Sequence, residues 1–306
     1  MTSAAFGTVL FAMLAGALRV STPFLFVSLG ECLTEKSGRI NLGNEGALVL
    51  GAMAAYAISY ETGNPWAGLL AAAGVGACLG LLHAALCSLT KVSDIAMGIA
   101  IMLAGTGTAF FFGKPYIQPS APQLPTIPFG FWSSSAQIRS ALDVSPLFFL
   151  GVIVGIAMAW GFRNTRLGLT IRIVGDSADS ARAMGLRINL IRLGATAVGS
   201  ALAGIGGAFL SLVYPGSWNE QLSSGQGLIA VALVVFARWN PLYCIGAALL
   251  FGAAGALGPS LQSVGISKGY YLFNAAPYVL TLVLMILSVR PGRSLKGAPG
   301  ELSIVR

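Results

Sequence analysis

Charged residues are scarce in this sequence. Asp, Glu, Lys and Arg together make up 9% of its 306 residues, whereas an average soluble domain has about 25%. So few charges cannot cover the surface of a water-soluble protein of this size, which excludes an ordinary soluble globule. Hydrophobic residues make up 56%, so the outside of the fold is expected to face lipid.

The motifs of common catalytic and energy-coupling sites are also missing. The four cysteines show no CxxC spacing, which argues against a zinc site or a redox pair. No GxxxxGK motif followed by Ser or Thr occurs, so ATP is not bound through a P-loop. Only Glu45 and His83 are expected inside the membrane, too few for a proton relay. We therefore expect no cofactor, no metal and no enzymatic activity, and a transport role would require energy from another subunit.

What the sequence has in abundance is apolar segments. They predict an all-α, polytopic membrane helix bundle with about nine transmembrane helices, in a range of eight to ten, forming a single transmembrane domain over residues 1–306. The segments lie at about 5–30, 44–60, 66–90, 94–112, 145–162, 190–212, 226–237, 241–258 and 270–289. Arg19 and Pro23 interrupt the first segment, which predicts one kinked helix, an interfacial helix followed by a short span, or two short spans. No basic residue precedes that segment, so we expect no cleaved signal peptide.

Lysine and arginine collect in alternate loops, which indicates the orientation. The arginine-rich loop 163–192 and the basic tail after residue 289 are expected in the cytoplasm, and four predicted spans separate them. The same parity places Lys36, Arg39, Lys91 and Arg238 inside. It leaves only Lys114, Arg139 and Lys268 outside, with Arg19 unassigned. We therefore expect a multi-pass protein of the plasma membrane with a cytoplasmic C-terminus. The net charge of +8 forms no continuous stripe, so no nucleic-acid partner is expected.

The longest predicted external segment, about 113–144, is rich in proline. Its repeated prolines forbid a helix and favour an extended, polyproline-like path across the membrane surface. The aromatic residues Phe129, Phe131 and Trp132 follow the prolines. Two compatible interpretations remain open, a lid held at the interface by these aromatics and a platform for an external partner.

The predicted cytoplasmic loop, about 163–190, contains a short capped helix within VGDSADSARAMGLR at 174–187. Its markers are an N-cap at Asp176 or Ser177, an apolar stripe of Ala178, Ala181 and Met184, and a left-handed stop at Gly185. A helix of about two turns is not stable alone, so it must lie against the membrane surface or a partner. The alternatives are an ordinary basic loop and a docking helix.

Polar residues enter the membrane at the start of the second apolar segment. Asn41, Asn44 and Glu45 lie in a glycine-punctuated stretch, 30–53. In a purely structural interpretation, Asn44 caps the helix and Glu45 is stabilised by the helix dipole. In a functional one, the broken backbone and the amides line a polar translocation path, because irregular backbone is tolerated in a membrane only beside a cavity or inside protein.

Three further features concern the apolar spans. Tyr214 and Trp218 are expected as interfacial anchors, or as a platform that stacks on a sugar or base. LAGTGTAF at 103–110 and LAGIGGAF at 202–209 suggest an internal repeat, although chance similarity in a chain so rich in Gly and Ala explains it as well. Small residues at four-residue spacing predict close helix packing at Gly199, Ala203 and Gly207, and at Ala248, Gly252 and Ala256.

Four blocks of the sequence, in order, resemble a known family. They are GECLTEKSGRINLGNEG at 30–46, TRLGLTIRIVGDSADSARAMGL at 165–186, GQGLIAVALVVFARWNP at 225–241 and APYVLTLVLMIL at 276–287. The chain resembles the permease subunits of bacterial ABC importers for simple sugars and nucleosides, which are more distantly related to ribose and branched-chain amino acid permeases. Its length is similar to that of the shorter permease in nucleoside-type pairs. Gln226 and Ala237 depart from the family's usual Arg and Gly, which leaves the substrate open.

This resemblance implies a permease domain that forms the translocation path together with a second permease. ABC ATPase subunits would supply the energy, and a periplasmic or lipid-anchored binding protein would deliver a small polar solute, a nucleoside or simple sugar, or alternatively a branched-chain amino acid. Correspondence with the family makes 175–186 the ATPase coupling helix, with Gly175, Asp176, Ala178, Ala181, Arg182 and Gly185 as its residues. A self-sufficient secondary carrier and an intramembrane enzyme are the competing classes; the first predicts flux from this chain alone, and the second needs a paired nucleophile and base within the spans.

Overall fold

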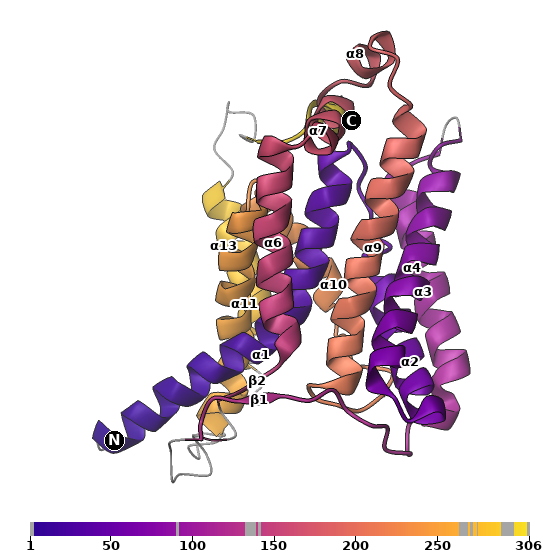
Figure 1. Cartoon of the computed structure of the whole chain (residues 1–306). Helices are drawn as coiled ribbons and strands as arrows, with labels where there is room; N and C mark the ends of the chain where they lie inside the picture. Colours follow the sequence, from indigo (N-terminus) through magenta and orange to yellow (C-terminus); the bar gives the residue numbers. More distant parts are fainter. Residues whose placement is uncertain are drawn as a thin grey trace.

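The computed structural model describes residues 3–89, 92–131, 139, 142–262, 269, 272–273, 275–288 and 297–304. Long helices lie side by side as a bundle, with the short helices α7 and α8 at one end (Figure 1). Within the described residues the sheet content is one antiparallel pair, β1 (Ile127–Pro128) with β2 (Asp143–Val144). The predicted all-α membrane bundle is thereby confirmed.

The helices follow the apolar segments of the sequence. In chain order they are α1 (Ser3–Lys36), α2 (Asn44–Thr62), α3 (Pro65–Leu86), α4 (Asp94–Gly113), the 3-10 helix η1 (Lys114–Tyr116), α6 (Pro146–Asn164), α7 (Arg166–Asp176), α8 (Ala178–Ala183), α9 (Ile188–Leu212), α10 (Gln226–Phe236), α11 (Pro241–Gln262), α13 (Ala276–Ser288) and α14 (Gly300–Ile304). Each of the nine predicted segments holds one of the apolar helices. Among the described residues, five helices are long and apolar enough to cross a membrane, namely α3, α4 with η1, α6, α9 and α11.

Local sequence explains where several helices begin. Asn64, Ser93 and Ser145 cap α3, α4 and α6, because each side-chain oxygen accepts a hydrogen bond from a backbone N–H of the first turn. Proline opens α3 and α6 at the position where its missing N–H costs nothing. These helix starts are therefore specified by residues that lie within a few positions of each other in the sequence.

The first apolar segment forms one continuous helix of 34 residues that passes through Arg19 and Pro23. The interpretation as two short spans is therefore wrong. The N-terminal part of α1 leans away from the bundle, whereas the rest runs through it (Figure 1). The Arg19 Nε donates a hydrogen bond of 3.2 Å to the Asp143 carbonyl and the guanidinium lies 6.0 Å from the Tyr214 ring, which places Arg19 at the end of the bundle opposite α8.

The segment predicted as a span at 226–237 is too short to be one. Its helix α10 has 11 residues, which is about 16 Å at about 1.5 Å per residue, whereas the hydrocarbon core is about 30 Å thick. Residues 213–225, which connect α9 to α10, are turns and irregular backbone. The helix α10 is about half as long as a full span and begins inside the bundle. The irregular residues 213–225 occupy the rest of the distance that a full span would cover.

Small residues let the backbones of the central helices touch. A Cβ on Gly207 would lie 2.0 Å from the Leu48 carbonyl oxygen, and one on Gly199 would lie 2.5 Å from the Gly30 oxygen. These approaches bring α9 against α2 and α1. The predicted small-residue packing is confirmed, and in the second predicted set a Cβ on Gly252 would lie 2.5 Å from the Ala17 oxygen.

The proline-rich segment 113–131 takes the extended path that its prolines predict, after the single 3-10 turn of η1. Side chains of α2 hold it in place: the Tyr56 hydroxyl donates to the Pro119 carbonyl at 2.8 Å, and the Ser59 hydroxyl donates to the Pro122 carbonyl at 2.6 Å. The Leu124 N–H also donates to the last residue of α9, Leu212, at 3.0 Å. Trp132 lies outside the described residues, as do Lys91 and Lys268. The repeat motifs lie on α4 and α9, and the internal repeat stays a prediction.

Candidate functional site

Polar residues from two irregular segments meet in the interior of the bundle. The first segment, residues 37–43, follows α1 and turns back among the helices before α2 begins. A Cβ on Gly43 would lie 3.1 Å from the Ile101 side chain, and Ile101 belongs to α4 well beyond its first turn. The start of α2 therefore lies inside the bundle, at a level where lipid-exposed irregular backbone is not tolerated.

A buried carboxylate organises this first segment. Glu31 accepts hydrogen bonds from the Asn41 backbone N–H at 2.8 Å and from the Asn44 Nδ2 at 2.7 Å. The Asn44 Oδ1 in turn accepts from the Asn41 Nδ2 at 3.1 Å and from the Ser200 hydroxyl on α9 at 3.0 Å. All four residues are buried. The network joins α1, α2 and α9 and satisfies the polar groups that the break in the backbone brings into the membrane.

The Glu45 carboxylate lies in the first turn of α2, as the sequence predicts, and it also stabilises a second helix. Its Oε2 accepts a hydrogen bond of 2.6 Å from the Gly227 N–H, and its Oε1 accepts one of 2.6 Å from the Ser223 hydroxyl. Gly227 lies in the first turn of α10, so Glu45 caps the start of that helix. The expectation that Asn44 caps α2 is wrong, because Gly43 holds the cap position and the Asn44 amide is engaged with Glu31 and Ser200.

The start of α10 is built as a sharp entry. Ser224 and Gly225 have φ values of 46° and 78°, which turn the chain into the helix. The Tyr278 hydroxyl, from α13, donates to the Ser224 carbonyl at 2.7 Å. Buried Gln226 Oε1 has no hydrogen-bond partner in the described residues. A helix that begins inside the bundle beside polar groups is a recurring element of transporter binding regions.

Trp218 belongs to the second irregular segment and is only 1% exposed. Its indole Nε1 donates a hydrogen bond of 2.9 Å to the Gly113 carbonyl at the end of α4. It is therefore neither an interfacial anchor nor an open stacking surface, because its ring is enclosed by the chain itself. The half-exposed Tyr214 retains the position expected of an interfacial aromatic.

The loop that was expected to hold a coupling helix contains two helices, α7 and α8. Ser177 caps α8, because its hydroxyl accepts from the Ser180 N–H at 3.2 Å, while Asp176 is the last residue of α7. Gly185 adopts a φ of 75° just after α8, the left-handed stop that its position predicts. A Cβ on Gly175 would lie 2.2 Å from the Lys36 carbonyl oxygen, so α7 crosses the end of α1 closely.

The predicted apolar stripe on α8 does not lie on one free face. Ala181 is fully buried in a small cluster with Val174 and Ile188, whereas Met184 is 56% exposed and Ala178 is partly buried. The reason is that the helix has only six residues and its inner side packs on α7 and α9. The outer side carries Asp179 and Arg182, a largely exposed ion pair with a 2.8 Å separation.

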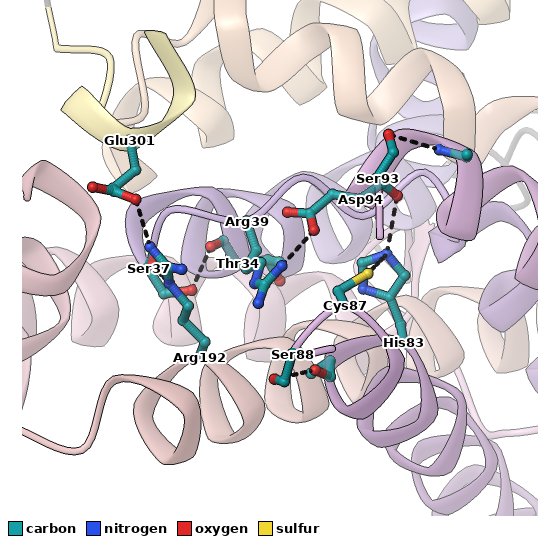
Figure 2. A network of polar contacts seen from close by, with 12 residues as sticks. Thr34, Ser37, Arg39, His83, Cys87, Ser88, Ser93, Asp94, Arg192 and Glu301 are labelled. Carbon is teal, nitrogen blue, oxygen red and sulfur yellow. Dashed lines mark hydrogen bonds and ion pairs between the residues drawn. The ribbon is translucent and has the colours of Figure 1, made fainter. Parts of the chain in front are cut away.

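A polar network lies beneath α8 at the same end of the bundle, and Figure 2 shows it from close by. Arg39 pairs with Asp94 at the start of α4, and the Asp94 carbonyl lies 3.3 Å from the His83 Nε2. Arg192 of α9 pairs with Glu301 of α14 at 3.0 Å. In the described residues, no group of three or more His, Cys, Asp or Glu is placed to bind a metal ion.

Sequence reasoning missed several residues of these sites. Glu31 and Glu35 lie one turn apart in an apolar helix, a signal that could have marked them as buried and paired. Glu35 accepts a hydrogen bond from the Trp239 Nε1. Ser200, Ser223 and Glu301 carried no such signal, because their partners are more than 100 positions away along the chain.

The family described as "Branched-chain amino acid transport system / permease component" matches residues 13–289. The chain belongs to this permease family. The match includes both interior irregular segments and the α7–α8 loop of this permease, whereas Glu301, which contacts that loop, lies outside the matched residues.

Three curated relatives cover most of this permease. TsgC13 of Haloferax volcanii, provisionally named a glucose ABC transporter permease, is 32% identical over 83% of this chain and 79% of its own. NupQ of Bacillus subtilis, a guanosine ABC transporter permease, is 30% identical over 87% and 88%. NupC of Lactococcus lactis, a nucleoside ABC transporter permease, is 26% identical over 90% and 91%. The predicted resemblance to sugar and nucleoside ABC permeases is confirmed, and the chain is a multi-pass membrane permease.

Proposed function

We propose that residues 1–306 act as one permease domain of an ABC importer for a nucleoside or a simple sugar. The functions named for the similar permeases, guanosine, nucleoside and glucose transport, support this substrate class over the branched-chain amino acids of the family description. A binding protein outside the membrane presents the solute. A second permease, in a heterodimer, completes the path, and separate ATPase subunits bind and hydrolyse ATP.

The observation that carries the proposal is the meeting of Glu45 with the start of α10 inside the bundle. Two breaks in the backbone converge there, at residues 37–43 and 213–225, and both are lined by polar groups. Asn41, Asn44 and Glu45 stand at this convergence, and Trp218 belongs to the second break, where it is buried and donates to the end of α4. We assign the translocation path to this region, because irregular backbone at membrane depth is retained beside a polar path.

The ATPase docks on the exposed side of α8 in this proposal. Asp179, Arg182 and Met184 form the contact surface, because all three are exposed. The other coupling residues form its frame: Gly175 allows α7 to cross α1, Asp176 and Ala178 join the two short helices, Ala181 packs inward, and Gly185 turns the chain toward α9. A push on α8 would thus reach α9, which carries Ser200 of the interior network.

Transport then follows from two arrangements of the bundle. Closure of the ATPase dimer on ATP moves α8 and shifts the permease pair between inward-open and outward-open states, with the loaded binding protein favouring one of them. The α8 end of the bundle faces the cytoplasm in this proposal, together with the C-terminus. The gathering of Lys36, Arg39, Arg192 and Arg238 at that end supports this orientation.

The docking side of α8 is tested with Met184→Asp in the complete complex reconstituted in liposomes. A buried charge at the contact should lower both transport and substrate-stimulated ATP hydrolysis by about tenfold or more. Met184→Leu is the matched control, because it keeps the apolar contact. Wild-type transport in the Met184→Asp complex would rule out docking at this surface.

The substrate class is tested by competition. Cells that express the whole system should take up a labelled nucleoside or monosaccharide, with inhibition by other members of that class and not by leucine or valine. Mass spectrometry of the small molecule that copurifies with the partner binding protein gives an independent answer. Uptake by this chain without any ATPase, abolished by uncouplers, would instead show a secondary carrier.

A further inference from the structure

The end of the described chain returns to the coupling region. Residues 297–304 lie over the inner ends of α1, α7 and α9, and Figure 2 shows Glu301 on this segment facing Arg192. A Cβ on Gly300 would lie 2.2 Å from the Asp176 carbonyl oxygen, so α14 touches the junction of α7 and α8. Lys36 of α1 donates to the Gly297 carbonyl at 3.2 Å. The segment is therefore attached at several points to the helices that surround α8.

The two carboxylate oxygens of Glu301 hold two different elements. Oε1 accepts a hydrogen bond of 2.8 Å from the Ala178 N–H, the first backbone amide of α8. Oε2 accepts one of 3.0 Å from the Arg192 Nη2 on α9. Arg192 continues the connection, because its Nε donates to the Ser37 carbonyl beyond the end of α1 at 3.1 Å. One side chain thus links α8 to α9 and, through Arg192, to α1.

These contacts matter because α8 cannot hold its own position. A helix of six residues is far below the length that is stable alone, so tertiary contacts must fix it. Ala181 supplies an apolar contact on the inner side, and Ser177 caps the Ser180 amide. Glu301 supplies the remaining polar attachment at the first amide. The Arg192 and Glu301 side chains are 12% and 21% exposed, so water competes weakly for these hydrogen bonds.

We propose that Glu301 is a positioning residue that fixes the coupling helix to α9 and α1. Force applied to α8 then moves the long helices instead of tilting α8 alone. This inference rests on the proposed docking of the ATPase at α8, and it adds the C-terminal segment to the coupling machinery. Loss of the Glu301 carboxylate leaves ATP hydrolysis in place and reduces the solute moved per ATP.

The experiment uses Glu301→Gln and Glu301→Ala in the full transporter complex in nanodiscs and liposomes. Glu61→Gln is the matched control, because it makes the same carboxylate-to-amide change at the opposite end, where Glu61 is exposed and accepts one hydrogen bond from Tyr116. Hydrogen exchange over 176–186 reports the attachment of α8. The ratio of transported solute to hydrolysed ATP reports coupling, and thermal melting with subunit stoichiometry shows whether the complex remains assembled.

We expect exchange over 176–186 to rise about tenfold in Glu301→Ala and less in Glu301→Gln, with no change in Glu61→Gln. The transport-to-ATP ratio should fall about threefold or more in the same order, at unchanged melting temperature and stoichiometry. If the Glu301→Ala complex fails to assemble, Glu301→Gln decides the question. Gln keeps an acceptor for the Ala178 amide, which favours assembly, but it loses the charge that pairs with Arg192.

Two outcomes would overturn the proposal. Unchanged exchange over 176–186 in both variants would show that Glu301 does not hold α8. Faster exchange with an unchanged transport-to-ATP ratio would show that the attachment has no part in coupling. Neither outcome depends on the docking test, because Met184→Asp reports separately whether the ATPase contacts α8. Wild-type transport in Met184→Asp, together with faster exchange in the Glu301 variants, would refute the docking surface and, with it, the coupling role of Glu301.

Discussion

The Glu45 carboxylate accepts a hydrogen bond of 2.6 Å from the Gly227 N–H, although the two residues are 182 positions apart in the chain. The contact joins the first turn of α2 to the first turn of α10, and both helices begin inside the bundle. A negative charge at a helix start is stabilised by the unpaired N–H groups there. This relationship organises the region to which we assign the translocation path.

Replacing Glu45 should weaken that junction. We expect Glu45→Ala to leave the Gly227 amide without its partner and to lower transport strongly, at a cost of about 1.5–3 kcal/mol in stability, as for a hydrogen bond to a charged group. Ser223→Ala removes one hydrogen bond and leaves the carboxylate on α10, so its effect should be smaller. Thermal unfolding and uptake in liposomes measure both. Equal effects of the two variants would show that capping of α10 is not the important interaction.

The environment of Asn44 should reject a second carboxylate. Asn44→Asp is nearly isosteric, but it replaces the amide group that donates to Glu31 with a carboxyl oxygen, so that two acceptors face each other. We expect a loss of about 2 kcal/mol or more in stability, whereas Ser200→Ala, which removes the two hydrogen bonds that α9 makes with Asn41 and Asn44 and leaves Glu31 its partners, should cost less. The measurement is the melting temperature of the purified permease. An unchanged melting temperature in Asn44→Asp would mean that Glu31 does not accept a hydrogen bond from Asn44.

The same substitution should destabilise the protein at one glycine of α9 and not at another. A Cβ on Gly204 would lie 2.2 Å from the Ala72 carbonyl oxygen, whereas a Cβ on Gly194 meets no atom within 4 Å. Gly204→Ala should force α9 from α3 and cost about 1–3 kcal/mol or more. Gly194→Ala should be neutral or slightly stabilising, because Ala favours the helix. The yield of folded protein and its unfolding temperature compare them directly.

Ala181 should act on folding, whereas its neighbour Ala183 should not. Ala181→Asp places a charge in the cluster with Val174 and Ile188, and we expect the permease to lose stability even without its ATPase. Ala183 is exposed on the same short helix, so Ala183→Asp should leave the stability of the isolated permease unchanged. Melting curves of the permease alone test this. Matching curves for the two variants would contradict the inward packing of Ala181.

The orientation can be tested with an impermeant thiol reagent on intact cells. Ser180→Cys on α8 should remain unlabelled, and Glu61→Cys at the opposite end should be labelled. Cys78 is exposed and is replaced by Ser in both, whereas the other cysteines are buried. Burial, with a contribution from Asp94, raises the pKa of the Cys87 thiol to about 12, so this thiol reacts slowly at neutral pH. Labelling of Ser180→Cys from outside would invert the proposed topology and remove the ATPase from α8.

The sequence alone determined the class of the molecule. With 9% charged residues and repeated apolar segments, a lipid-facing helix bundle is the arrangement that satisfies the backbone in a membrane. Local signals also determined many helix starts, such as the caps at Ser93 and Ser145, and the stops at glycines such as Gly185. These depend on neighbours a few positions away, and periodicity and capping rules describe such neighbours well.

Only the tertiary structure decided which helix each buried polar group serves. Glu45 caps α10 in addition to lying in the first turn of α2, Trp218 is enclosed instead of interfacial, and Ala181 faces inward instead of toward a partner. A hydrogen bond between residues far apart in the chain leaves no periodic pattern, because any polar side chain in a membrane must find some partner and local sequence does not specify which one. The short length of α10 could not be predicted from the sequence for a similar reason. An apolar segment has the same composition whether it crosses the whole bilayer or begins at its middle.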